Sequence, residues 1–369
     1  MLIGDKNYQS IWVDEDDPSA VCVIDQQKLP FYFEIRKIRS VDDMYGTIHD
    51  MTVRGAPVIG AAGAFGVYLA TLGCRSTSDP LNNICNCATY LASCRPTAVN
   101  LSGAINYMVE KLSHAPEGKP LSETALEAAR EICSTEIESC RRIGRNGLPL
   151  IEAVSRKKKG AAVNILTHCN AGWLACIDYG TALSPVYFAH EAGIPVHVWV
   201  DETRPGNQGA RLTTWELEKA GVPYTLIPDN MGGHLMQHGM IDLVFVGCDR
   251  ASRKGDVANK IGTYLKALAA FDNNVPFYSA LPSSSFDFNI SDAVNEIPVE
   301  ERDAEEVTGI SGLSEGKIIS VRICPENAHA LNYSFDVTPA RLITGLITER
   351  GICRPGEKDI KKMFSDKFR

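Results

Sequence analysis

The sequence lacks the features that mark nucleic-acid-binding, exported or membrane proteins. Its net charge is −8 and its only dense basic run is residues 156–159, whereas nucleic-acid binding usually depends on a basic face. That run is typical of a solvated helix end, although it could also lie near a phosphate. Residues 1–6 show no signal-peptide pattern, and no apolar stretch approaches the roughly 18 to 20 residues that cross a bilayer. We therefore expect a cytoplasmic protein with no nucleic-acid partner and no membrane partner.

The twelve cysteines lack the spacing of a disulfide framework or a structural metal site. No Cys-x-x-Cys pair occurs, and Cys85 and Cys87 have no second pair that would complete a zinc site. Without a secretory signal, cysteines in a large chain are expected to be reduced thiols that pack as small hydrophobic residues. We therefore expect no metal.

Two nucleotide-binding signatures are also absent. No Gly-x-Gly-x-x-Gly follows an expected strand, and no Gly-Lys-Ser/Thr sequence of a phosphate-binding loop occurs. The glycines at 60, 63 and 66 have helical spacing and no strand before them, which favours close helix packing.

The composition is that of a two-domain globular protein. The chain has 369 residues, of which 44% are hydrophobic and 22% charged. Residues 1–145 are expected to form a smaller N-terminal domain, with short strands at 10–13, 20–24 and 31–35 and then helices through about residue 144. Residues 146–369 are expected to form the second domain.

The second domain alternates strands with helices. Short apolar strands are expected at 163–166, 195–200, 224–227, 243–246 and 276–280, with helices at 181–192, 213–220, 231–238 and 259–271. This alternation predicts an α/β fold with a Rossmann-like parallel sheet. The carboxyl ends of such strands share one edge, where ligands bind near the switch point in strand order.

The segments that follow the strands are polar, which suits a small phosphorylated ligand. They are residues 167–172, 201–211, 228–231, 247–250 and 280–287. Arg204, Arg211 and Lys260 offer positive charge, and a helix opening near Asn259 would offer backbone N–H groups. Residues 54–57, at a helix start in the first domain, offer the same chemistry.

Two of these residues are candidates for chemistry. Cys169 could be a packed thiol or a reacting group, because it follows a strand between a histidine and an Asn-Ala-Gly turn. Asp249 could cap a helix or pair with Arg250, but a carboxyl group at the end of an apolar strand could also act as an acid. His168 is expected to be structural, because neighbouring residues on an extended strand end point to opposite sides. The pattern alone indicates a small-molecule enzyme or a sensor.

Six motifs, in order over nearly the whole chain, resemble the methylthioribose-1-phosphate isomerase family. They lie at 51–57, 93–101, 167–172, 202–217, 255–264 and 335–339. The resemblance implies a Rossmann-like C-terminal domain, a homodimer and an aldose–ketose isomerase of methionine salvage that uses no cofactor. It also implies Cys169 and Asp249 as the catalytic pair, with substrate contacts at Arg54, Gly55, Ala56, Arg95, Gln208, Asn259 and Lys260.

The resemblance leaves alternatives open, because the wider group includes ribose-1,5-bisphosphate isomerases and regulatory subunits of a translation-initiation exchange factor. The chain could act on 5-deoxyribose 1-phosphate or ribose 1,5-bisphosphate, or it could be a non-catalytic sensor of sugar phosphates or nucleotides. Cys248 stands beside Asp249 where the family usually has alanine. The substituent at C5 of the sugar and the route of hydrogen transfer, enediol or hydride shift, both stay open.

Overall fold

The computed structural model describes residues 1–74, 78–95 and 98–368, and its chain divides into two units. The N-terminal unit comprises Met1–Ser139 together with Trp173–Asp178, and the C-terminal unit comprises Cys140–Gly172 together with Tyr179–Arg369. The sequence placed the boundary at 145/146, whereas the division falls inside helix α5 (Leu121–Lys157). Helical periodicity continues across it, so neither composition nor turn residues mark the change.

The N-terminal unit combines small antiparallel sheets with helices. Its strands are β1 (Leu2–Ile3), β2 (Lys6–Asn7), β3 (Ile11–Val13), β4 (Val21–Ile24) and β5 (Ile35–Ile38), and its helices are α1 (Val41–His49), α2 (Ala56–Gly73), α3 (Pro80–Ser93), α4 (Val99–Ser113), the first part of α5 and the short helix η1 (Trp173–Ala175). Strand β4 lies between β3 and β5 and is buried along its length. The third strand begins later than predicted, because the amides of Phe31 and Tyr32 close a turn onto the carbonyl of Lys28.

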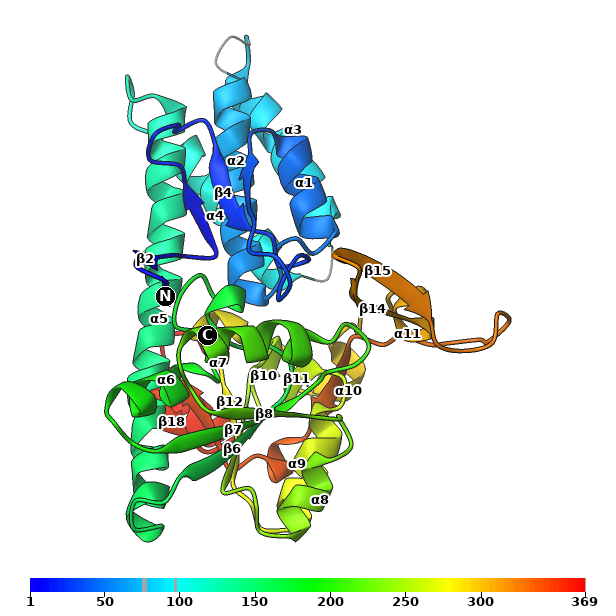
Figure 1. Cartoon of the computed structure of the whole chain (residues 1–369). Coiled ribbons are helices and arrows are strands. Elements are labelled where there is room, and N and C mark those ends of the chain that lie inside the picture. The colour runs from blue at the N-terminus through cyan, green and yellow to red at the C-terminus, as the bar shows by residue number, and fades with distance from the viewer. Residues whose placement is uncertain (75–77, 96–97, 369) are drawn as a thin grey trace. The chain divides into compact units, whose positions relative to one another are not determined.

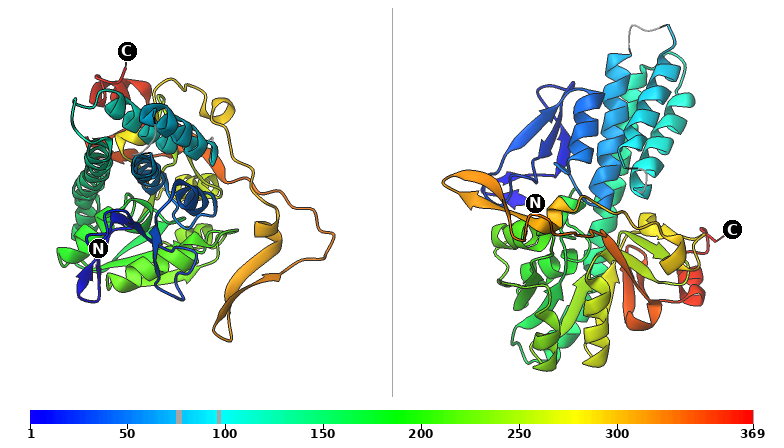
Figure 2. Two further views of the ribbon diagram at one scale, coloured as in Figure 1. Left: turned by 90° about the horizontal axis from the view of Figure 1, so that it is seen from above. Right: turned by 90° about the vertical axis from the view of Figure 1, so that its right-hand side faces the viewer.

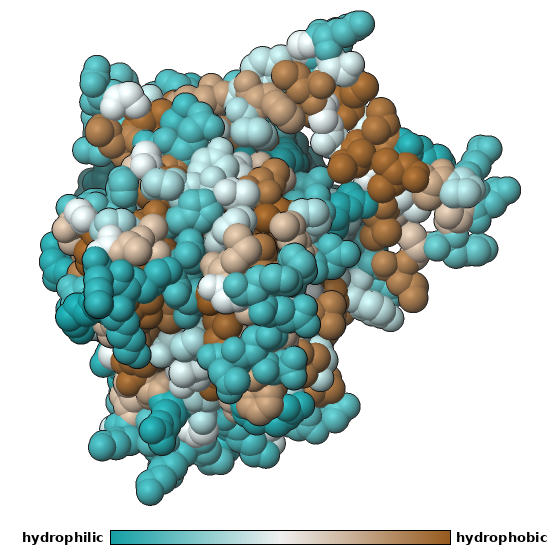
Figure 3. Space-filling model, turned by 60° about the horizontal axis from the view of Figure 1, so that its bottom comes forward, coloured by the Kyte–Doolittle hydropathy of each residue, from teal (hydrophilic) through white to brown (hydrophobic). Residues whose placement is uncertain are grey.

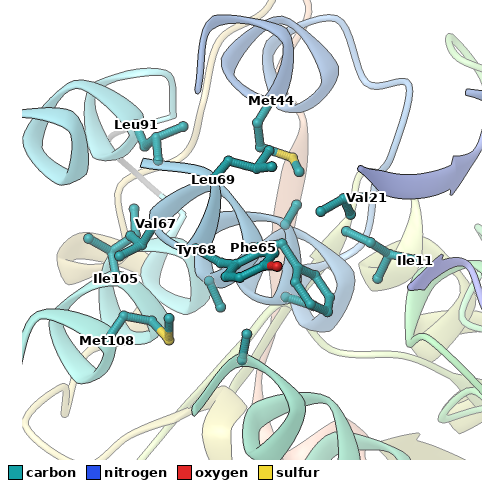
Figure 4. Close-up of a cluster of buried hydrophobic side chains, with 14 of the residues drawn as sticks. Ile11, Val21, Met44, Phe65, Val67, Tyr68, Leu69, Leu91, Ile105 and Met108 are labelled. Carbon is teal, nitrogen blue, oxygen red and sulfur yellow. The ribbon is translucent and has the colours of Figure 1, made fainter. Parts of the chain in front are cut away.

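Helix α2 is the core of this unit. Its 18 residues are long and apolar enough to cross a membrane, so the expectation that no such stretch exists was wrong, but 83% of them are buried inside the protein. Figure 4 shows Phe65, Tyr68 and Leu69 of α2 beside Met44 and Leu91 of neighbouring helices. The close helix packing predicted from the glycine spacing is confirmed at Gly63, where a Cβ atom would lie 2.6 Å from Leu101 Cδ1, and at Gly66, where it would lie 2.7 Å from Leu91 Cδ1.

The segment Trp173–Asp178 belongs to the N-terminal unit although it follows the first strand of the other unit. Ser10 donates its amide to the carbonyl of Ile177 over 3.0 Å, and the Gln26 side chain donates to the carbonyl of Leu174 over 2.9 Å. Ile177 is part of the buried cluster around α2. Six residues remote in sequence therefore complete the core of this unit.

The C-terminal unit is built on a seven-stranded sheet (Figure 1). Its strands are β6 (Val163–Thr167), β7 (Val196–Asp201), β8 (Tyr224–Ile227), β9 (Leu243–Val246), β12 (Phe277–Ala280), β17 (Gly345–Thr348) and β18 (Gly351–Cys353). The strand order is β18-β17-β12-β9-β6-β7-β8, and the neighbours are parallel except β17 with β18. The chain runs outward from β6 in one direction and then from β9 in the other. The predicted α/β fold with a mostly parallel sheet is thus confirmed, and the switch point in strand order lies between β6 and β9.

Helices cover both faces of this sheet. They are α6 (Ser184–Glu191), α7 (Thr214–Lys219), α8 (Gly232–Gln237), α9 (Thr263–Asp272) and, near the C-terminus, α12 (Glu357–Met363). Figures 1 and 2 show α8 and α9 together on one side of the sheet, and α6 with the last turns of α5 on the other. Gly144 and Gly147 of α5 allow this second contact, because a Cβ atom at either would overlap α6.

A second sheet in this unit was not predicted. It has the order β13-β10-β11-β16, with strands β13 (Phe286–Asp287), β10 (Arg250–Ser252), β11 (Val257–Lys260) and β16 (Phe335–Thr338). The helix predicted over 259–271 was therefore wrong at its start, since Asn259 and Lys260 pair with β16. Helix α9 begins only after Gly262, whose φ of +100° suits glycine. The first half of β11 pairs with the nearby β10, but Asn259 and Lys260 pair only with β16, some eighty residues later.

The remainder of the unit consists of short helices and a hairpin. Its elements are the short helices η3 (Ser283–Ser285), η4 (Ala340–Leu342), α10 (Ala293–Glu296) and α11 (Glu305–Thr308), and the hairpin of β14 (Gly309–Ser314) and β15 (Lys317–Arg322). The hairpin extends away from the rest of this unit (Figures 1 and 2), and hydrophobic side chains gather on the projecting part at the right of Figure 3. Ile319, Val321 and Ile323 are 41%, 47% and 55% exposed. The acidic segment before the hairpin, residues 300–306, has no buried residue.

An exposed ion pair near the C-terminus gives a prediction for low pH. Arg350 Nη2 donates to Asp366 Oδ2 over 3.0 Å, and Nη1 donates to Oδ1. These hydrogen bonds lower the pKa of Asp366 from 3.8 to about 2. Because the folded-state pKa is lowered, the pair stabilises the fold above pH 3.8 and loses that contribution as pH falls toward 2. We expect NMR titration to give a midpoint near 2 for Asp366 and a midpoint near 3.8 in Arg350→Met; equal midpoints would contradict it.

Candidate functional site

Cys169 lies just beyond the end of β6, held by hydroxyl groups from two other loops. Its backbone φ is +66°, and its side chain is 8% exposed. The Cys169 amide donates to Thr203 Oγ1 over 2.8 Å, and its carbonyl accepts from Thr213 Oγ1 over 2.8 Å. Thr203 follows β7, and Thr213 ends the π-helix η2 (Gly209–Thr213). Both polar groups of the Cys169 backbone are therefore fixed from outside its own strand.

The residues after Cys169 pack against a buried glutamate. Asn170 Nδ2 donates to Glu216 Oε1 over 2.9 Å, and Tyr187 Oη donates to Glu216 Oε2 over 2.8 Å. Glu216 is 0% exposed. A Cβ atom at Gly172 would lie 1.8 Å from Glu216 Oε2, so the glycine of this motif is required by the glutamate behind it.

Gly172→Ala is expected to destabilise the protein by about 1 to 3 kcal/mol, as overpacking in a closed site does. Glu216 cannot move away cheaply, because both its carboxylate oxygens are hydrogen-bonded inside the protein. The measurement is urea denaturation of the wild type and the variant. Gly160→Ala is the control for glycine-to-alanine change without a clash, since no atom lies within 4 Å of its Cβ position, although its φ of +86° adds a backbone cost. Equal stability of Gly172→Ala and wild type would contradict the close contact between residue 172 and Glu216.

Asp249 follows β9, the strand beside β6. The two strands are parallel, with Leu166 opposite Val244, so their carboxyl ends lie together. Their loops touch, since a Cβ atom at Gly247 would lie 2.8 Å from Ala171 Cβ. The half-buried Asp249 donates its amide to the carbonyl of Ala258 over 2.9 Å. The switch point thus brings the loops of Cys169 and Asp249 into contact.

Cys248 is not a second candidate base. Burial, and next the negative charge of Asp249, raise the pKa of the Cys248 thiol well above its ordinary value of 9.0. The thiol therefore stays neutral at physiological pH, and only thiolates are effective nucleophiles or bases.

Both ring nitrogens of His168 lie within hydrogen-bond distance of oxygen atoms of the protein. Its Nδ1 lies 3.0 Å from Asp201 Oδ2, and its Nε2 lies 2.8 Å from the carbonyl oxygen of Ile261. Lys266 Nζ lies 3.2 Å from the same Asp201 oxygen, and all three side chains are almost completely buried. Both ring nitrogens are thus engaged by oxygen atoms of the protein. His168 therefore cannot serve as the base of Cys169, and its supporting role is confirmed.

This cluster also contains the one group of three potential metal ligands found among the described residues. Side-chain atoms of His168, Asp201 and Asp229 lie within 4.8 Å of one another. However, Asp229 already accepts the amides of Thr203 and Arg204, over 2.7 and 2.6 Å, and Asp201 faces the Lys266 ammonium. A cation would compete with a buried ammonium group and two N–H donors. These residues therefore fit a hydrogen-bonded charge cluster better than a metal site.

The other residues singled out in this unit lie on two elements. Gln208 precedes η2 and folds back on Gly206, and its Oε1 is buried without a partner in the part of the chain that the structure describes. Asn259, 4% exposed on β11, donates to Thr263 Oγ1 over 3.1 Å, and the Lys260 ammonium lies 5.7 Å from the centre of the Phe335 ring. Asn259 Oδ1 would be 3.9 Å from a Cβ atom at Gly247, which places it beside the Asp249 loop.

The N-terminal unit holds the remaining four. Arg54 and Gly55 directly precede α2, Ala56 is its first residue, and Arg95 follows α3 just before residues 96–97, which lie outside the described chain. Gly55 has a φ of +99°, and a Cβ atom there would lie 2.5 Å from the carbonyl oxygen of Ala175. Packing alone therefore requires glycine at this position.

Two groups that the sequence offers as phosphate contacts are hydrogen-bonded to other parts of the protein. The Arg204 guanidinium donates to the carbonyls of Val307 and Gly309, over 2.7 and 3.1 Å, so it fixes the base of the hairpin. At the start of α9, the amides of Gly262, which directly precedes the helix, and Tyr264 donate to the Asp336 carboxylate over 2.7 and 3.0 Å. The sequence marked Asp336 only as part of the last motif, and it gave no sign of Thr203, Thr213 or Glu216 as supports of Cys169.

The chain is similar to known proteins over most or all of its length. A model of the initiation factor 2 subunit family matches residues 52–355. The methylthioribose-1-phosphate isomerase from Desulfatibacillum aliphaticivorans is 53% identical over 369 residues, with both chains fully covered. The solved structure of 5-methylthioribose 1-phosphate isomerase from Pyrococcus horikoshii OT3 is 36% identical, with a TM-score of 0.85 and coverage of 98% of this chain and 97% of that one. The translation initiation factor eIF-2B subunit delta from A. fulgidus is 37% identical, with a TM-score of 0.81 and coverage of 97% and 100%.

Proposed function

The chain belongs to the methylthioribose-1-phosphate isomerases, within the initiation factor 2 subunit family, and we propose that it converts 5-methylthioribose 1-phosphate to 5-methylthioribulose 1-phosphate in methionine salvage. The reaction is an aldose–ketose isomerisation, an intramolecular oxidoreduction that needs no external oxidant or reductant. The observation that supports the proposal is the contact between the loops after β6 and β9, which carry Cys169 and Asp249.

The chemistry explains why an acid is needed. An aldose 1-phosphate is locked as a cyclic acetal, so the bond between C1 and the ring oxygen must break while that oxygen takes a proton. The hydrogen on C2 then moves to C1, and the C2 hydroxyl loses its proton to leave a ketone. One proton is given and one is recovered, so a single carboxyl group can serve both steps. We assign this shuttle to Asp249.

Cys169 acts at the hydrogen transfer. In the enediol route its sulfur takes the proton from C2 and returns it to C1, and in the hydride-shift route it is a polarisable neighbour of the rearranging carbons. Deuterium placed at C2 tests these routes. A hydride shift keeps all of the label at C1, whereas loss of label to water shows that the Cys169 sulfur took it as a proton and exchanged it before returning a proton to C1.

The remaining assignments follow the family pattern. Arg54, Gly55, Ala56, Arg95, Gln208, Asn259 and Lys260 are the proposed substrate contacts. Positively charged side chains and backbone N–H groups suit the C1 phosphate, and fixing that phosphate orients the sugar, which can contribute several kcal/mol to catalysis. The proposal includes a cytoplasmic homodimer that uses no cofactor and has no nucleic-acid or membrane partner.

A kinetic comparison of three substrates tests the function. The purified protein is mixed with ribose 1-phosphates that carry 5-methylthio, 5-deoxy or 5-phospho groups, and the ketose is followed by NMR. We expect the highest kcat/KM for the methylthio substrate. A preference for the 5-phospho or 5-deoxy compound would reassign the substrate, and no turnover of any of them would overturn the isomerase.

The likeness to an initiation-factor subunit supplies a second candidate, a non-catalytic regulatory subunit that binds a sugar phosphate or nucleotide. The initiation-factor subunit from A. fulgidus is 37% identical to this chain, whereas the isomerase from Desulfatibacillum aliphaticivorans is 53% identical. Binding of methylthioribose 1-phosphate in calorimetry without any turnover is the result that favours it.

A further inference from the structure

We propose that Thr203 is a positioning residue whose hydroxyl holds the Cys169 backbone in its left-handed conformation and so fixes the direction of the Cys169 side chain. The functional half of this inference rests on the proposed role of Cys169 in the isomerisation. Its structural half, the control of Cys169 by Thr203, stands independently of the reaction.

Both residues have backbone conformations that need support. The φ of Cys169 and the φ of Thr203 are each +66°. Few non-glycine residues adopt this region, and a β-branched residue such as threonine is an outlier there. Such conformations persist only where the surroundings over-determine them, and they concentrate at functional sites. Here two of them are joined by one hydrogen bond, from the Cys169 amide to Thr203 Oγ1.

Thr203 is itself held from three directions. The carboxylate of Asp229 accepts the amides of Thr203 and Arg204, one on each oxygen, over 2.7 and 2.6 Å. The Thr203 hydroxyl donates its proton to the carbonyl of Asp201 over 3.1 Å. Gly209 closes the third side, since a Cβ atom there would lie 2.9 Å from Thr203 Oγ1. The carboxylate at the end of β8 thus stabilises the strained residue at the end of β7.

Because the Thr203 hydroxyl donates its proton to Asp201, it can act only as a hydrogen-bond acceptor toward Cys169. With its only hydrogen directed at Asp201, Thr203 Oγ1 presents lone pairs, and these accept the Cys169 amide. Thr203 is 0% exposed and Cys169 is 8% exposed, so water is poorly placed to replace this acceptor. Loss of the hydroxyl would leave a buried N–H group unsatisfied, and the Cys169 peptide would relax away from its present conformation.

Valine and serine separate this role from packing. Thr203→Val keeps the β-branched shape and removes the acceptor, whereas Thr203→Ser keeps the acceptor. Thr338→Val is the matched control, because Thr338 is also 0% exposed in the same unit and its hydroxyl has no partner among the described residues. Asp229→Asn is a second test variant, since it weakens the support under Thr203 without changing Thr203 itself.

The experiment measures kcat and KM for methylthioribose 1-phosphate and, separately, the rate at which iodoacetamide alkylates Cys169, followed by mass spectrometry. We expect Thr203→Val to lower kcat about 10- to 100-fold with KM nearly unchanged, from the usual effect of an unsatisfied buried donor. Its Cys169 alkylation rate should change several-fold. Thr203→Ser should restore both values, Thr338→Val should match wild type, and Asp229→Asn should shift both in the direction of Thr203→Val.

Two results in the threonine variants would overturn the proposal. Wild-type kcat and alkylation rate in Thr203→Val would overturn the proposal, as would a serine variant no better than the valine variant. If Thr203→Val does not fold, the same two rates in Asp229→Asn decide. If the wild type turns over no sugar phosphate, the proposed function fails while the alkylation rates still test the control of Cys169 by Thr203.

Discussion

Asp249→Asn should lower the turnover of methylthioribose 1-phosphate by about 10²- to 10⁴-fold, the usual contribution of a general acid or base. The amide has the shape of the carboxyl group but has no proton to give to the ring oxygen and cannot take one from the C2 hydroxyl. The backbone of Asp249 donates to the carbonyl of Ala258 through its amide, and that bond is unaffected by the substitution. The loop should therefore keep its position while the chemistry fails.

Cys248→Ala is the control for this experiment. The raised pKa of Cys248 keeps its thiol neutral, so removing the sulfur should leave turnover close to wild type. Steady-state kinetics on both variants, with circular dichroism to verify the fold, gives the comparison. Asp249 would lose its assigned role if its variant kept a tenth of wild-type turnover, or if Cys248→Ala fell as far.

Asp201→Asn should be the most destabilising single change in the buried charge cluster. The Asp201 carboxylate is 0% exposed and lies between His168 and Lys266, 3.0 and 3.2 Å from their nitrogens. Replacing it with a neutral amide leaves the buried Lys266 ammonium without its carboxylate and weakens the contact at His168 Nδ1. Breaking a buried ion pair by removing one partner costs about 3 to 5 kcal/mol. We expect a loss of that size.

Chemical denaturation with urea measures this loss. Asp366→Asn is the matched control, because the same change then breaks an exposed pair with Arg350, and exposed pairs contribute at most about 1 kcal/mol. A small effect at Asp201 would contradict the expected cost of removing this buried carboxylate. Comparable losses in the two variants would contradict the importance of burial.

Five strands of the sheet that carries the site could be predicted from the sequence because their signals are local, whereas β17 and β18 were not predicted. Strands β8 and β9 have the predicted bounds, since short apolar runs between turn residues mark buried strands. Placing Cys169 and Asp249 after strands then puts them at one edge, and the observed strand order places their loops in contact. The motifs supplied the identity of the pair, which spacing alone did not.

The supports of the site could not be predicted, because they depend on contacts between loops. Thr203 carries no signature as a partner of Cys169, and Glu216 is recognisable only once Asn170 and Gly172 are seen against it. The sequence predicts a helix start at Asn259 and Lys260, whereas these residues pair with the remote strand β16. In each case the determining interaction joins residues that no local pattern relates.

The continuity of α5 and the return of Trp173–Asp178 bear on how this protein can be divided. A cut between Ser139 and Cys140 would fall in the middle of a helix, so both products would begin or end with unpaired backbone groups. It would also remove Ile177 and Leu174 from the partners Ser10 and Gln26. No single cut in the chain separates the two units. Splitting the gene at one point would therefore not give two proteins that each contain one complete unit. Production of either unit by itself would need more than one cut in the chain.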